Sequence, residues 1–184
     1  MGSSAEPVRL ALRKLWSDHV IWTREYIAAA VAGTPDADAA AGRLLKNQED
    51  IGAAVAGFYG QAGGDKLTVL LKEHIMIAVD LVAAAKSGDN AAFATHDARW
   101  TSNIGDIARF LASANPNWPE KEVLDLLALH LKLTKDEAVA RITGDWAADV
   151  KAFDDIFTEI MVVADTLHDG IVAQFPDRFA AASA

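Results

Sequence analysis

One short pattern, an apolar pair followed by a histidine, occurs three times and constrains the fold more than any other feature of the chain. The copies are residues 15–19, 70–74 and 126–130, and in each the histidine stands four positions after the first apolar residue. The three histidines, which are His19, His74 and His130, recur at a nearly constant interval. A regular recurrence of this kind predicts three similar structural units packed against one another.

The residues around each histidine predict helices. Apolar side chains recur three and four positions apart, as on one face of an α-helix, and no segment shows the alternation of a strand. The chain is 52% hydrophobic and rich in Ala and Leu, which have high helix propensities. Thr134 with Glu137 matches a capping box and predicts a new helix start there. The expected helices cover about 7–33, 38–59, 65–87, 91–112, 119–131, 135–142 and 145–172.

We expect these helices to form one all-α domain built from three αα-hairpins. The repeat units would cover about 7–62, 65–115 and 119–172, within a single domain of residues 5–176. Three units of this length close more readily into a bundle of about six or seven helices than into an extended array. Residues 1–4 resemble a vector-derived leader, and residues 177–184 are expected to form a C-terminal tail.

Composition excludes several functional classes. The net charge of −9 argues against a nucleic-acid partner, because phosphates require a basic surface. The chain has no cysteine, which excludes disulfides, zinc–thiolate sites, iron–sulfur clusters and thiol nucleophiles. No run approaches the roughly 18 apolar residues of a membrane-spanning helix. A leader that replaces a signal peptide leaves both a periplasmic or secreted and a cytoplasmic location open.

A second set of polar residues recurs on the partner helices. The shift along the chain that carries His74 onto His130 also carries Asn47 onto Asn103, and Asn103 onto Glu159. The same shift carries Asp50 onto Asp106. Residues three positions apart share a helix face, so each Asn and its Asp lie within or at the edge of an apolar stripe. Burying such groups costs roughly 2–7 kcal/mol each unless they are hydrogen-bonded or bound to a metal.

Two interpretations of this polar set remain open. In the first, each histidine pairs with the Asn or Asp of its own hairpin, and the polar layers only fix packing in a structural or protein-interaction module. In the second, several side chains converge on a ligand, because helical bundles build metal sites from His and carboxylates on facing helices. The candidate metal or ligand residues are His19, His74, His130, Glu159, Asn47, Asp50, Asn103 and Asp106.

The second interpretation predicts binding of a divalent transition metal or a small ligand, without catalysis. Three histidine nitrogens and one carboxylate suit zinc, copper, nickel or iron, although the Glu-x-x-His and His-x-x-x-His pairs of specific metal motifs are absent. The first interpretation instead predicts an exposed apolar patch or a stable homo-oligomer. No nucleophile elbow or phosphate-binding loop is present, and His96 and His168, which have no repeat counterpart, are predicted to be surface residues.

Several longer motifs resemble an uncharacterised bacterial all-helical family. They are His-Val-x-Trp-Thr-Arg at 19–24, Asn-Gln-x-Asp-Ile-Gly at 47–52, Asn-Pro-Asn-Trp at 115–118 and Gln-Phe-Pro at 174–176. Further shared segments fall at 59–60, 67–75, 84–89, 100–111, 130–134 and 164–171. The resemblance extends over nearly the whole chain and implies an all-helical fold.

Members of that family often carry automatic names such as glycosyltransferase or acetylglutamate kinase. This sequence has neither a nucleotide-binding loop nor an α/β pattern to support either name. Some members begin with signal peptides, in line with a leader that replaces one. Members often have a histidine where this chain has Glu159. In a metal site at that position, the exchange would replace an imidazole nitrogen with a carboxylate oxygen and so favour harder metal ions.

Overall fold

The computed structural model describes residues 5–179, and every regular element in that range is a helix. The helices are α1 (Glu6–Ala32), α2 (Ala37–Ser87), α3 (Asn90–Ala114), α4 (Glu120–Thr143), α5 (Trp146–Gln174) and α6 (Pro176–Phe179). The predicted all-α bundle of six or seven helices is thus confirmed. The expected leader at 1–4 lies outside the described residues, as do residues 180–184 of the expected tail, whose first residues belong to α6.

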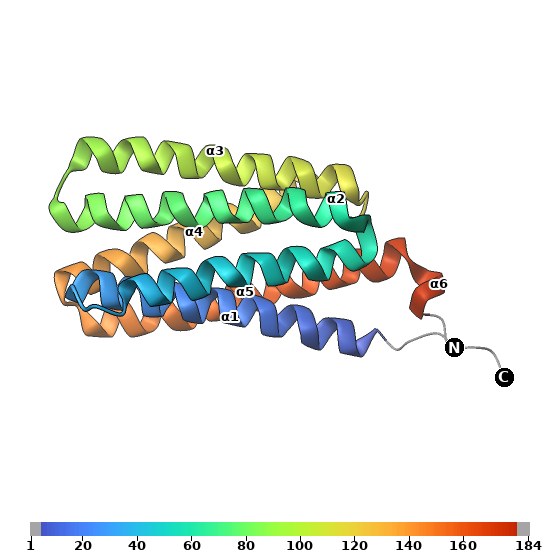
Figure 1. Ribbon diagram of the computed structural model, residues 1–184, viewed down its shortest axis with the longest axis horizontal. Helices are drawn as coiled ribbons and strands as arrows, with labels where there is room; N and C mark the ends of the chain where they lie inside the picture. Colours follow the sequence, from blue (N-terminus) through green and yellow to red (C-terminus); the bar gives the residue numbers. More distant parts are fainter. Residues whose placement is uncertain (1–4, 180–184) are drawn as a thin grey trace.

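Helix α2 is bent back on itself at Gly60. This residue has φ 77° and ψ 165°, a conformation that is essentially restricted to glycine, so the helix cannot continue straight through it. In Figure 1 the two arms of α2, residues 37–59 and 61–87, run in opposite directions. The sequence predicted a break here but placed the start of the second arm near Asp65, whereas helix resumes directly after Gly60.

The bundle consists of antiparallel helical hairpins arranged around a common interior. Helix α1 packs against the first arm of α2, the second arm packs against α3, and α4 packs against α5 (Figure 1). Contacts of α1 with α5 and of α3 with α4 join the hairpins to one another. Helices α1, α2 and α4 each end at a glycine with φ of 72–73°, namely Gly33, Gly88 and Gly144. The hydrophobic core contains side chains from each of the helices α1 to α5.

The arms of α2 approach each other closely at Gly52 and Gly64. A Cβ atom at Gly64 would stand 2.5 Å from the backbone oxygen of Gly52 and 2.6 Å from Ala56 Cβ. We therefore expect Gly64→Ala to force the arms apart and to lower the free energy of unfolding by about 1–3 kcal/mol. Gly57→Ala is the matched control, because nothing lies within 4 Å of its Cβ position. Chemical denaturation compares the variants, and equal loss in both would contradict this close packing.

Helix α4 runs without a break through the segment where two shorter helices were expected. The capping-box prediction was wrong, because Thr134 Oγ1 donates to His130 O at 2.9 Å, as in a continuing helix. The carboxylate of Glu137 accepts a hydrogen bond from Arg24 of α1 at 2.6 Å instead of one from the backbone of Thr134. A buried pairing between helices therefore overrides the local capping pattern.

His168 is buried, so its prediction as a surface residue was wrong. Only 3% of the residue is exposed, because the start of α1 packs over it, and its Nε2 lies 3.2 Å from Ala5 O. Its Nδ1 contacts Asp169 Oδ1 at 2.7 Å. His96 is half-buried, with Nδ1 3.9 Å from the carboxylate of Asp80. His168 lies outside the repeat, so the sequence offers no pattern that predicts its burial by the distant start of α1.

Candidate functional site

The three repeated histidines meet inside the bundle. His19 comes from α1, His74 from the second arm of α2 and His130 from α4, and each is at most 4% exposed. Their ring centres lie 5.4 Å apart for His19 and His130, 6.3 Å for His74 and His130, and 6.4 Å for His19 and His74. The fold thus gathers the recurring residues around one point, which we call the three-histidine centre.

The Nδ1 atom of each ring contacts a polar side chain on the second helical segment of its own hairpin. These contacts are Gln48 Nε2 to His19 at 3.2 Å, Asn103 Oδ1 to His74 at 2.9 Å, and Glu159 Oε2 to His130 at 3.0 Å. In all three pairs the partner stands 29 residues after the histidine. Each ring is therefore oriented by its own hairpin, while the three rings together converge on the interior.

The contacts of Asn103 and Glu159 define which nitrogen carries the proton in two of the rings. Asn103 Nδ2 donates to Leu70 O at 3.1 Å, which leaves Oδ1 to accept a hydrogen bond from His74 Nδ1. Glu159 likewise accepts a hydrogen bond from His130 Nδ1. Only one nitrogen of a neutral imidazole is protonated, so in that form the Nε2 atoms of both rings present lone pairs.

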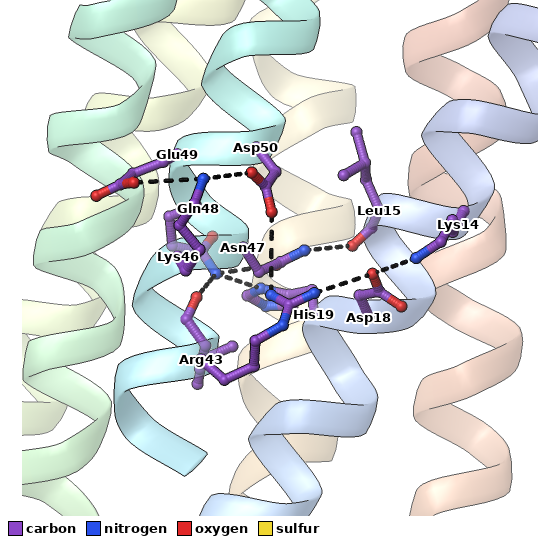
Figure 2. A network of polar contacts seen from close by, with 11 residues as sticks. Lys14, Leu15, Asp18, His19, Arg43, Lys46, Asn47, Gln48, Glu49 and Asp50 are labelled. Carbon is purple, nitrogen blue, oxygen red and sulfur yellow. Dashed lines mark hydrogen bonds and ion pairs between the residues drawn. The ribbon is translucent and has the colours of Figure 1, made fainter. Parts of the chain in front are cut away.

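In the first hairpin the partner of His19 is an amide nitrogen of Gln48 instead of an oxygen, so the proton lies on the other ring nitrogen (Figure 2). Gln48 Nε2 lies 2.9 Å from Leu44 O, 3.1 Å from Asn47 Oδ1 and 3.2 Å from His19 Nδ1, so its two hydrogens are shared among three neighbours. An amide nitrogen cannot accept a hydrogen bond, so His19 Nδ1 faces it as an acceptor. Asn47 is fixed in turn by a hydrogen bond of 2.9 Å from its Nδ2 to Leu15 O. His19 Nδ1 is thus an acceptor, and the neutral ring carries its proton on Nε2.

Burial keeps two of these rings uncharged. Desolvation lowers the pKa of His19 well below its usual value, and the neighbouring His130 and His74 lower it further. Burial also lowers the pKa of His74 from about 6.5 to about 3. At neutral pH both rings are therefore neutral, which is the form that accepts a hydrogen bond or binds a metal ion.

All three histidines line two internal cavities. The larger has a volume of about 40 Å³ and is otherwise lined mainly by apolar side chains such as Leu71 and Val163. The smaller, of about 20 Å³, is bordered by Ile27 and Trp100 among others. No hydrogen bond from residues 5–179 reaches the three Nε2 atoms. Because the two nitrogens of an imidazole ring point away from each other, we expect Nε2 to face the interior where Nδ1 faces its partner.

Polar atoms without protein partners are concentrated at this level of the bundle. In the described part of the chain, seven buried side-chain atoms have no hydrogen bond, and four of them belong to residues that contact the three rings: Trp16 Nε1, Trp100 Nε1, Gln48 Oε1 and Glu159 Oε1. The other three are Arg43 Nη1, His96 Nδ1 and Glu137 Oε2. The two indole rings lie 5.5 and 5.0 Å from rings of the three-histidine centre. An unmet buried donor or acceptor costs about 1–3 kcal/mol, so each of these atoms needs an explanation.

The spacing of the rings fits hydrogen bonding better than metal coordination. Three imidazole nitrogens about 2.0–2.1 Å from one tetrahedral ion would place the ring centres about 5 Å apart. Three nitrogens about 2.8–3.0 Å from one hydrogen-bonded atom, at the same angles, would place the ring centres about 6.5 Å apart. Two of the three separations are 6.3 and 6.4 Å, and the third, between His19 and His130, is 5.4 Å. In agreement, no group of three or more His, Asp or Glu side chains within residues 5–179 is arranged to hold a metal ion.

Two of the predicted site residues lie away from the three-histidine centre. Asp50 belongs to an ion-pair network at the surface, 2.6 Å from Lys46 and 4.0 Å from Arg43 (Figure 2). Asp106 is exposed and pairs with Arg109. Each carboxylate stands at the solvent edge of its helix, where its charge stays hydrated, although the asparagine three positions earlier is buried.

Sequence reasoning missed Gln48, which contacts His19 directly. The shift from His74 to His130 matched Asn47 to Asn103. The slightly shorter shift from His19 to His74, which applies to the first two hairpins, matches Gln48 to Asn103 instead. Applying that spacing to the partner helices would have identified Gln48. Asn47 is buried as expected, but it supports Gln48 rather than a histidine.

A comparison with protein-family models, curated proteins and solved structures found no significant match to this chain. None of the helices that the structure describes is long and apolar enough to cross a lipid bilayer. The function must therefore be inferred from the geometry of the three-histidine centre.

Proposed function

We propose that the protein binds one small ligand at the three-histidine centre and does not transform it. The concentration of buried polar atoms without protein partners around the rings carries this proposal. A purely structural layer is expected to satisfy its own donors and acceptors, because each unmet group costs about 1–3 kcal/mol. Here each ring engages its hairpin partner through Nδ1 and keeps Nε2 for the interior.

The hydrogen-bonding pattern selects the class of ligand. His74 and, in its neutral form, His130 offer acceptor lone pairs, whereas His19 offers an N–H donor. A hydroxyl group donates one hydrogen bond and accepts others, so it can accept from His19 and donate to one of the two acceptor nitrogens at a time. The ligand is therefore a small neutral molecule with a hydroxyl or similar group, and a water molecule satisfies the same three rings when no ligand is bound.

A divalent transition metal is the second candidate. The hydrogen bonds from His130 to Glu159 and from His74 to Asn103 are of the kind that orient histidine ligands in metal sites. The net charge of −9 also favours a cation. A metal would nevertheless require the rings to close by up to about 1 Å, and Gln48 to stop donating to His19, because each ligand nitrogen needs a free lone pair.

Histidine-detected NMR with ethanol as the probe tests the proposal. We expect saturable shifts of the Nε2 resonances of the three-histidine centre in long-range ¹H–¹⁵N spectra. The dissociation constant should be about 1 mM or weaker, because each of the three non-hydrogen atoms gains at most about 1.5 kcal/mol. His74→Leu should abolish the response, whereas His96→Leu, a matched change outside the centre, should retain it.

Each outcome of this titration has a definite meaning. Saturable shifts that depend on His74 support the hydroxyl site. No response to ethanol, together with uptake of one equivalent of Co²⁺ that His74→Leu abolishes, would replace it with the metal site. No response to either probe would refute ligand binding and favour a structural or protein-interaction module whose polar layer only fixes helix packing.

A further inference from the structure

The larger cavity has one polar wall and is otherwise apolar. The polar wall is the three-histidine centre, and the remaining walls come from core side chains of several helices, including Leu12, Val55, Leu71, Ile107 and Val163. Its volume is about 40 Å³. A water-sized group takes roughly 10–15 Å³ on this measure, so the cavity has room for about three such groups.

The lining of this cavity selects what can fill it. A buried water molecule needs two to four polar partners, and away from the histidines the walls offer mainly carbon atoms. An apolar group needs no such partners and gains about fourfold in affinity for each methylene that it buries, at roughly 0.8 kcal/mol each. The cavity therefore suits the apolar part of a molecule whose polar end meets the rings.

We infer that this cavity is a chamber for an apolar group of about three carbon atoms, so that the ligand is a short-chain alcohol or a similar small amphipathic molecule. The inference rests on the proposed function, because it assigns the remainder of the molecule whose hydroxyl group meets the three-histidine centre. It also sets an upper limit on ligand size, since the surrounding core is close-packed.

Two kinds of probe test the chamber separately from the histidines. Xenon, which forms no hydrogen bond, is expected to shift the methyl resonances of Leu71 and Val163 saturably and to leave those of Val20 unchanged, because Val20 is in the core but lines neither cavity. In a series of straight-chain alcohols, affinity should rise about fourfold per carbon up to 1-propanol and fall for 1-pentanol.

Matched variants make the test decisive. Val163→Ile adds one methylene to the wall and should weaken xenon binding about tenfold or more, whereas Val20→Ile, an equal change elsewhere in the core, should leave it within about twofold. Absence of saturable xenon shifts, or equal binding by both variants, would overturn the chamber. Xenon binding without any response of the histidines to alcohols would leave the chamber standing and refute only the proposed hydroxyl site.

Discussion

Replacing His130 with leucine is expected to destabilise the folded protein by about 3–5 kcal/mol. The reason is the partner that remains, because Glu159 is 5% exposed and its Oε2 has His130 Nδ1 as its hydrogen-bond partner at 3.0 Å. Its other oxygen, Oε1, already has no partner in the described part of the chain. His130→Leu therefore leaves a buried carboxylate without compensation, and denaturant unfolding measures the loss.

A second substitution separates this effect from simple loss of packing. The double variant with His130→Leu and Glu159→Leu removes both polar groups, and replacing a buried pair by apolar residues of similar volume is often neutral or stabilising. We expect it to recover most of the stability that His130→Leu loses. Equal instability of the single and double variants would show that the carboxylate is not the source of the loss.

Acid is expected to destabilise the protein through His74 by as much as about 5 kcal/mol between pH 6.5 and pH 3. Burial lowers the pKa of His74 to about 3, so in this range the unfolded chain binds a proton that the folded chain does not. The contribution of His74 to the free energy of unfolding is fully present above pH 6.5. Below that pH it decreases by about 1.4 kcal/mol per pH unit. His19, whose pKa is also lowered, acts in the same direction.

Glu137 opposes this trend over part of the range. Burial raises its pKa to about 7, against the opposing hydrogen bond from Arg24, so between pH 4.5 and pH 7 the folded chain retains a proton that the unfolded chain releases. Stability from Glu137 therefore falls as pH rises through this window. Unfolding free energies measured across pH should show a smaller acid loss in His74→Gln than in the unsubstituted protein. Glu137→Gln should show a larger acid loss, and unchanged slopes in both variants would contradict the assigned pKa shifts.

Helix period and histidine spacing were sufficient to predict the helical bundle and the three histidines inside it. Helical periodicity predicts burial because a residue on an apolar helical stripe points to the interior. The two patterns did not show which ring nitrogen faces the partner helix. The structure answers this with Nδ1 toward Gln48, Asn103 and Glu159. The internal repeat itself stays a prediction, which the common spacing of 29 residues supports.

Other features could not be predicted because they depend on contacts between distant segments. The capping pattern at Thr134 is a local signal, and the pairing of Glu137 with Arg24, 113 residues earlier, overrides it. Asp50 shares a broad helix face with Asn47, yet it turns to Lys46, because a carboxylate at the edge of a stripe keeps its hydration there. Homo-oligomer formation, the absence of a nucleic-acid partner and the cellular location stay predictions.

A high-resolution crystal structure of the purified protein tests the central claim most directly, through the electron density between the three rings. We predict one peak about 2.8–3.0 Å from the Nε2 atoms of His19, His74 and His130, as expected for a hydroxyl group or a water molecule. A peak about 2.0–2.1 Å from the same atoms would identify a metal site instead. Rings whose Nε2 atoms bond to other protein groups, with no shared peak between them, would contradict a ligand site at the three-histidine centre.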